Sequence, residues 1–109
     1  MARYAFTVFS KPVAGQEPEY NRWYDEQHLG DVLKVPGFVA AQRFKLAQPD
    51  PNAPAQYLAI YQIESDDLQQ TMTALQVRAG TKDMPLSPAL DAQGVRAFIY
   101  EATTDLRRG

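Results

Sequence analysis

The chain has 109 residues, of which 45% are hydrophobic and 22% charged, and its 11 basic and 13 acidic side chains give a net charge of -2. This length suits one domain, residues 1–109, with enough chain to bury a core. There is no cysteine, which excludes thiol nucleophiles, Cys-ligated zinc, iron–sulfur clusters and a disulfide framework. We therefore expect a protein of the reducing cytoplasm.

The charge pattern argues against nucleic acid and membranes as partners. Basic residues are scattered from Arg3 to Arg108 without forming a stripe, and the pI is near 5.3. The longest apolar stretches, such as Tyr4 to Phe9, are too short to cross a bilayer, and the N-terminus lacks the pattern of a signal peptide.

The first predicted elements are a strand and a helix. The aromatic and β-branched run at residues 3–10 predicts a strand, which a Lys-Pro pair ends. Pro18 and its acidic neighbours favour the first turn of a helix from Glu17 to about His28.

One face of this helix is aromatic, and in an uninterrupted α-helix it would hold Tyr20, Trp23, Tyr24 and Gln27. After His28 the hydrophobic phase slips, because Leu29 and Leu33 would fall on the polar side of a straight helix. Gly30 lies between them, so we expect a break there and then a short helical turn, residues 31–35, ended by Pro36-Gly37.

The second half of the chain predicts two more strands, a helix and a last strand. In chain order they are a strand at residues 38–47, a proline-rich loop at 48–54, a strand at 55–64, a helix from an N-cap at Ser65 to Gly80, and a strand at 95–103. Residues 81–94 contain two prolines and no clear periodicity, and are either a lid or a stiff contact arm. We expect the tail, residues 106–109, to be frayed.

The element order β-α-β-β-α-β predicts an α+β, ferredoxin-like domain, in which a four-stranded antiparallel sheet carries two helices on one face. The strands are apolar on both sides: Tyr4, Phe6 and Val8 alternate with Ala5, Thr7 and Phe9. Two helices cover one face only, so we predict that the other face meets a second copy in a homodimer.

The only histidine, His28, is the strongest candidate for acid–base chemistry. Tyr24 lies one turn before it, so the imidazole can point toward the sheet, and Asp25 or Asp31 could orient it. The structural alternative is that His28 caps the end of the helix, where the helix dipole favours a cation.

Arg43 and the tyrosines are weaker candidates. Arg43 lies in mid-strand, where it needs a carboxylate partner, solvent or an anionic ligand, and a structural ion pair is the commonest of these. Tyr61 is one of several tyrosines that could donate a hydrogen bond to a substrate oxygen or simply pack. One histidine and scattered carboxylates predict no metal site, although a single histidine is enough to ligate haem.

Residues 20–44 resemble the dimeric α/β-barrel superfamily, nearest to its EthD-like members, through YNRWYDEQHL at 20–29, DVL at 31–33, VPGF at 35–38 and QRF at 42–44. The resemblance implies two ferredoxin-like subunits joined sheet to sheet, each with a pocket between sheet and helices. It also implies that His28 is catalytic and that Trp23, Tyr24 and Arg43 lie near the pocket. Gly30 departs from the pattern, because many relatives have proline there.

These observations favour a cofactor-free enzyme that carries out proton transfer of the isomerase, lyase or cyclase type, or monooxygenation. The substrate would be a small apolar oxygenated molecule such as a lactone, enol or phenolic acid. His28 would be the general acid or base, Tyr61 would hold an oxyanion, Arg43 would neutralise a carboxylate, and Trp23 and Tyr24 would line the pocket. The alternatives are a non-catalytic dimeric ligand-binding, accessory or stress protein, and a haem-binding protein that uses His28.

Overall fold

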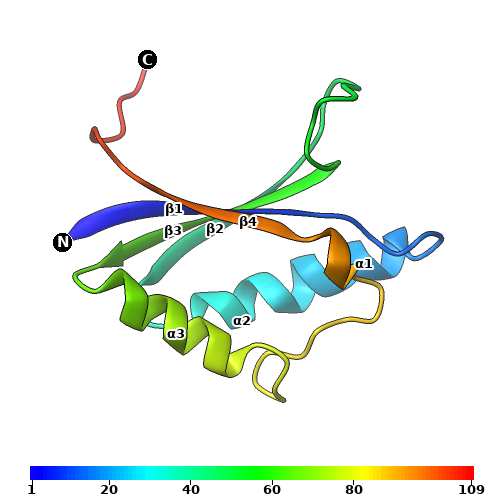
Figure 1. The fold of residues 1–109 in the computed structure, drawn as a ribbon, viewed down its shortest axis with the longest axis horizontal. Helices are drawn as coiled ribbons and strands as arrows, with labels where there is room; N and C mark the ends of the chain where they lie inside the picture. The colour runs from blue at the N-terminus through cyan, green and yellow to red at the C-terminus, as the bar shows by residue number, and fades with distance from the viewer.

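The computed structural model describes all 109 residues. Its four strands are β1 (Ala2–Ser10), β2 (Phe38–Lys45), β3 (Tyr57–Ser65) and β4 (Arg96–Glu101). They form one antiparallel sheet in the order β2-β3-β1-β4. All the helices lie on one face of this sheet (Figure 1). The predicted ferredoxin-like α+β fold is therefore confirmed.

The first helical region is a single rod made of three segments. They are α1 (Glu17–Trp23), the π-helical turn η1 (Tyr24–His28) and α2 (Leu29–Leu33). The remaining helices are α3 (Leu68–Arg78) and the short 3₁₀ turn η2 (Ala92–Gly94).

The predicted break at Gly30 is wrong, because the π-helical turn absorbs the phase slip instead. The amide of Leu29 donates to the carbonyl of Tyr24, five residues earlier, so one extra residue fits into this turn. Gln27 is exposed as a result, and Val32 turns toward the core. The rod ends at Leu33, earlier than the predicted residue 35, and Gly37, with a φ of +97°, lies in the turn that leads into β2.

Ser65 is not the N-cap that the sequence predicted, because it still belongs to β3, where it pairs with Ala2. The N-cap of α3 is Asp67, whose carboxylate accepts a hydrogen bond from the amide of Gln70 at 3.1 Å. The hydroxyl of Ser65 instead bonds to that of Thr71 at 2.7 Å and ties the end of β3 to α3.

The core lies between the sheet and the rod. Strand register places one set of side chains on this side, since Phe6 pairs with Tyr61, and Val8 with Ala59. Residues 81–94 close the end of this layer rather than hanging free. Met84 and Ala89 are buried, and the carbonyl of Ala89 accepts a hydrogen bond from the amide of Val13 at 2.7 Å.

The opposite face of the sheet carries no helix. The β2–β3 connection and the C-terminal segment both rise from this side, at opposite ends of the sheet (Figure 1). Its side chains include exposed Phe44, Phe98 and Tyr100, together with half-buried Phe9 and Ile60. No helix has the length and apolar character that a membrane span needs.

Candidate active site

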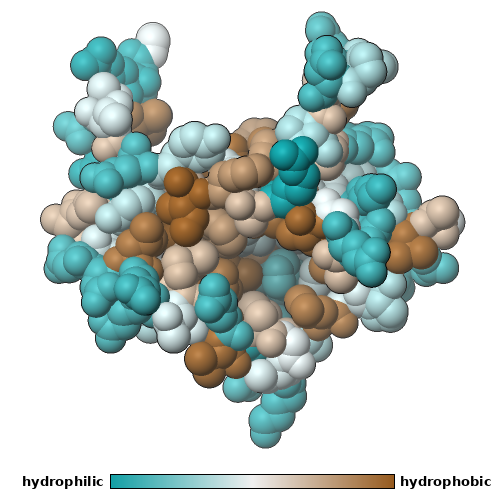
Figure 2. Space-filling model, in the orientation of Figure 1, coloured by the Kyte–Doolittle hydropathy of each residue, from teal (hydrophilic) through white to brown (hydrophobic).

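A cavity of about 340 Å³ lies between the helix-covered face of the sheet and the rod. Its lining is apolar or aromatic except for Ser10 and His28. Strand β1 contributes Phe6 and Val8, and the segment before β4 contributes Met84 and Leu86. Figure 2 shows the corresponding hollow, bordered by hydrophobic side chains. Such a shape and lining are typical of small-molecule sites.

His28 lies in the wall of this cavity and is held between two aromatic rings. Its imidazole stacks on the indole of Trp23 with ring centroids 4.5 Å apart and meets the ring of Tyr24 edge-on at 5.2 Å. The π-helical turn explains this arrangement, since stacking between residues five apart in sequence needs a wider turn than an α-helix has. Because the rod continues to Leu33, His28 does not cap a helix end.

Burial controls the ionisation of His28. Removal from water lowers the pKa of its imidazole from 6.5 to about 4, and the nearby carboxylate of Asp31 opposes that shift only in part. The ring is therefore neutral at pH 7. Its Nδ1 is buried without a hydrogen-bond partner, and neither Asp25 nor Asp31 orients the ring by a hydrogen bond.

Tyr61 provides the second unpartnered group in the cavity wall. This side chain extends from the middle of β3 and is almost fully buried, and its hydroxyl has no partner within the protein. Burial raises the pKa of its phenol, so the hydroxyl stays protonated and can donate a hydrogen bond. Tyr24 also lines the cavity, and burial raises the pKa of its phenol as well.

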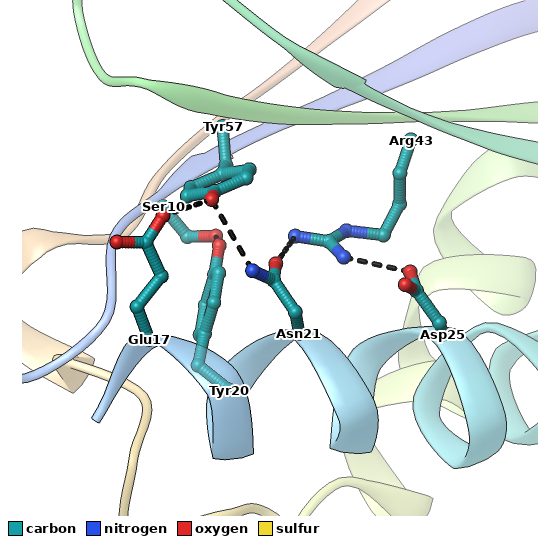
Figure 3. A network of polar contacts seen from close by, with 7 residues as sticks. All are labelled: Ser10, Glu17, Tyr20, Asn21, Asp25, Arg43 and Tyr57. Atoms are coloured by element: carbon teal, nitrogen blue, oxygen red, sulfur yellow. Dashed lines mark hydrogen bonds and ion pairs between the residues drawn. The ribbon is translucent and has the colours of Figure 1, made fainter.

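Arg43 does not line the cavity but joins a polar network between β2 and the rod. Its guanidinium donates to Asp25 at 2.7 Å and to the side-chain oxygen of Asn21 at 3.0 Å (Figure 3). It also lies over the ring of Tyr24, 4.3 Å from the centroid. Asn21 in turn donates to the hydroxyl of Tyr57 at 3.2 Å. The structural ion pair that the sequence favoured is thus formed.

The network continues toward the start of the rod. The hydroxyl of Tyr57 donates to the carboxylate of Glu17, and the hydroxyls of Ser10 and Tyr20 lie 2.6 Å apart (Figure 3). These contacts fix the rod against β1 and β3. They were not evident from the sequence, because each joins residues from separate elements.

Of the predicted site residues, the structure brings His28, Trp23, Tyr24 and Tyr61 together at the cavity and leaves Arg43 outside it. Residues 81–94, which the sequence left open as either a lid or a stiff contact arm, supply Met84, Leu86 and Leu90 to the wall. The indole of Trp23 donates to the carbonyl of Pro85 at 3.0 Å and anchors this segment. In the sequence, the two prolines of residues 81–94 indicated a segment with a fixed conformation.

A second, larger hollow of about 630 Å³ lies beside the C-terminal segment, outside the core layer. It is lined by charged residues such as Arg3 and Glu64 and contains no imidazole. No group of three or more His, Asp or Glu side chains that could hold a metal ion occurs anywhere in the structure.

Similar structures show the ferredoxin-like fold. An EthD family protein from Bacillus halodurans C-125 is 18% identical with a TM-score of 0.61, covering 94% of this chain and 100% of its own. A dimeric ferredoxin-like protein of unknown function from Jannaschia sp. CCS1 is 14% identical with a TM-score of 0.60, covering 92% and 99%. This chain has their fold. The predicted resemblance to EthD-like proteins is thus confirmed for the fold.

The haem degrader MhuD from Mycobacterium tuberculosis, whose structure holds two haems in its active site, is 19% identical with a TM-score of 0.64. The match covers 95% of this chain and 99% of that protein. No protein-family model matches the chain, and no curated protein matches it in sequence. At these identities the comparisons establish the fold and leave the chemistry to the site itself.

Proposed function

We propose that the chain is a cofactor-free enzyme that moves a proton on a small, apolar, oxygenated molecule bound in the cavity. The observation that carries the proposal is that His28 and Tyr61 share this apolar wall and that each has a buried polar atom without a partner. Buried polar groups are nearly always hydrogen-bonded, so two unpartnered ones in one cavity favour a ligand that supplies the missing bonds.

The neutral imidazole of His28 is suited to act as a base. It takes a proton from a carbon or oxygen of the substrate, while the Tyr61 hydroxyl donates a hydrogen bond to the oxygen on which negative charge develops. The carboxylate of Asp31 favours the imidazolium that forms. Returning the proton to another substrate atom completes an isomerisation, and elimination or ring closure gives a lyase or cyclase.

Monooxygenation would share the same first step. Removal of the proton leaves an electron-rich enolate or phenolate, and a substrate able to reduce dioxygen itself would then need no cofactor. Trp23 and Tyr24 hold the imidazole ring from two sides and fix its direction in every variant of this chemistry.

Proton removal can be tested without knowing the product. Small lactones and enolisable ketones are incubated with the protein in D₂O, and loss of the signal from hydrogen next to the carbonyl is followed by proton NMR. We expect the wild type to accelerate this exchange and His28→Gln to abolish it. Tyr61→Phe should slow it by about 10²-fold, as the loss of one oxyanion donor does elsewhere.

Tyr100→Phe is the matched control, because Tyr100 loses the same hydroxyl from an exposed position outside the cavity. Its exchange rate should equal that of the wild type. If His28→Gln exchanges substrates as fast as the wild type, the enzymatic proposal is wrong. Binding of the same compounds without exchange would favour the ligand-binding or accessory role instead.

Haem is the second candidate ligand, because the similar protein MhuD holds it. The residues here fit it poorly. His28 is the only candidate axial ligand in the cavity, and none of the lining residues is an arginine or lysine that could pair with the haem propionates. We therefore derive no step through haem.

We also propose that the functional unit is a homodimer joined through the helix-free face of the sheet. Aromatic and aliphatic side chains from all four strands meet on this face, and Phe9 packs edge-on against Phe98 with centroids 6.3 Å apart. An apolar sheet face without a covering layer is typical of an interface, and a second copy offers a complementary one.

A further inference from the structure

The cavity is unusual in having polar groups but no charge. Its wall contains no aspartate, glutamate, lysine or arginine, its one imidazole is neutral at pH 7, and its hydroxyls belong to Ser10, Tyr24 and Tyr61. The Ser10 hydroxyl is already engaged with Tyr20 at 2.6 Å. What the wall offers a ligand is therefore two phenols that can donate and an imidazole that can accept.

Arg43, the cation that could have paired with an anionic ligand, already has partners within the protein. Arg43 is outside the wall and is bound to the carboxylate of Asp25 at 2.7 Å. Its side chain is only 11% exposed, and its remaining contacts are Asn21 and the faces of three tyrosines. Turning it toward the cavity would break its bonds to Asp25 and Asn21 and its contacts with the tyrosine rings.

From this geometry we infer that the cavity selects neutral ligands that combine a hydroxyl or carbonyl oxygen with an apolar body, and rejects their carboxylate analogues. The inference rests on the proposed function, since it concerns the ligand of the same site. A carboxylate transferred into this wall would lose its hydration and gain no cation, which is costly in an apolar environment. A neutral phenol or ester loses less and still receives the hydrogen bond from Tyr61.

This inference narrows the substrate class that the sequence suggested. Phenolic acids and other carboxylates are excluded, whereas lactones and enols remain. If the inference holds, Arg43 does not neutralise a ligand carboxylate, which is the role that the sequence suggested for it.

Three naphthalene compounds of similar size test the inference: 2-naphthol, 2-naphthoate and methyl 2-naphthoate. Binding to the wild-type protein is measured by calorimetry at pH 7.5, and shifts of the His28 ring signals in NMR report that the ligand is in the cavity. We expect the naphthol and the ester to bind at least about tenfold more tightly than the carboxylate. The ester is the decisive control, because it differs from the carboxylate chiefly in charge.

A gain-of-affinity variant tests the cause. Leu86 lines the cavity but is 49% exposed, so Leu86→Arg can place a cation at its mouth without burying it. This variant should bind 2-naphthoate about tenfold more tightly than the wild type does, and methyl 2-naphthoate no more tightly. Val77→Arg, on the exposed surface of α3 outside the cavity, should change neither affinity.

Equal affinity of the wild type for the carboxylate and the ester would overturn the inference, as would failure of both neutral compounds to bind. The outcome is separable from that of the proposed function. Selective binding without proton exchange leaves the inference standing and removes the catalytic role. Proton exchange on carboxylate substrates as fast as on neutral ones overturns the inference and leaves the catalytic role standing.

Discussion

At the scale of single residues, the burial of His28 couples protonation to folding. The imidazole has a pKa of about 4 in the folded chain and 6.5 when it is exposed, so between these pH values the unfolded chain binds more protons than the folded one. The free energy of unfolding should therefore fall as the pH is lowered from 6.5 to 4 and then level off with respect to this group. The full effect is about 3 kcal/mol.

Urea denaturation at a series of pH values measures this dependence. His28→Gln is the matched variant, because it removes the only imidazole and leaves every carboxylate in place. We expect the stability of the wild type relative to the variant to stay constant above pH 6.5 and to fall as the pH is lowered from 6.5 to 4. Parallel stability curves for the two proteins across this range would show that His28 is solvated in the folded state.

Side chains that are close in sequence were the predictable part of the site. Tyr24 and His28 lie one helical turn apart, so helical geometry indicated that they would meet, whereas the stacking of Trp23 on His28 depends on the π-helical turn. Strand alternation did not decide whether Tyr61 faces the helices, because β3 has apolar residues on both of its sides. The sequence did not identify the partner of Arg43, because Asp25 lies 18 residues before it and Asp31 provides a second carboxylate in the same part of the chain.

At the scale of elements, the π-helical turn and the Arg43 network depend on each other. Asp25 belongs to η1, and its bond to Arg43 at 2.7 Å fastens this turn to β2, while the guanidinium lies over Tyr24 in the same turn. π-helical turns are rare and occur mostly as single bulges within α-helices, frequently at functional sites. We infer that Arg43 positions His28 although it does not touch the cavity.

Replacing Arg43 should therefore destabilise the fold and disturb His28 together. Arg43→Met keeps the apolar stem but loses the donors to Asn21 and Asp25, and we expect a loss of about 2 kcal/mol in the free energy of unfolding. The same change on the rod surface, Arg22→Met, removes an exposed pair with Glu19 and should cost at most about 0.5 kcal/mol.

The NMR signals of the His28 ring give a readout beyond stability. The indole of Trp23 stacks on this ring, so its ring current shifts the imidazole proton signals. In folded Arg43→Met these signals should move toward the values of a free histidine, whereas in Arg22→Met they should stay. Unchanged His28 signals in both variants would mean that the π-helical turn keeps its shape without Arg43. Arg43 would then contribute only to the stability of the fold.

The elements themselves were largely predictable, and the exceptions have physical reasons. Alternating apolar residues and proline boundaries gave all four strands to within a few residues. The phase slip after His28 was visible, but sequence periodicity could not distinguish a break at Gly30 from an inserted residue. Ser65 and Asp67 are both good caps, and only the pairing of Ser65 with Ala2 decides between them.

At the scale of the whole molecule, the proposed dimer rests on the helix-free face of the sheet. Strand pairing places Leu58 beside Phe9 and Phe44, and Ile60 beside Thr7. The β2–β3 connection and the C-terminal segment rise on either side of this apolar floor (Figure 1). A second sheet packed between them would exclude water from the helix-free face. Burial of apolar surface from water is the main driving force for such an association.

A charged side chain introduced on the helix-free face should therefore prevent dimer formation and give monomers. Phe98 is 42% exposed on β4, so Phe98→Lys is compatible with the fold of one chain, but a second sheet would bury the lysine without a partner. Light scattering coupled to gel filtration should give twice the 12.2 kDa chain mass for the wild type and the single mass for the variant. Val77→Lys, 71% exposed on α3, should remain dimeric.

Circular dichroism separates dissociation from unfolding in this experiment, and Phe44→Lys on β2 repeats it at the other side of the same face. If the wild type already runs as a monomer at concentrations of tens of micromolar, the sheet face has another occupant. If Phe98→Lys and Phe44→Lys both stay dimeric while Val77→Lys dissociates, the contact lies on the helical side.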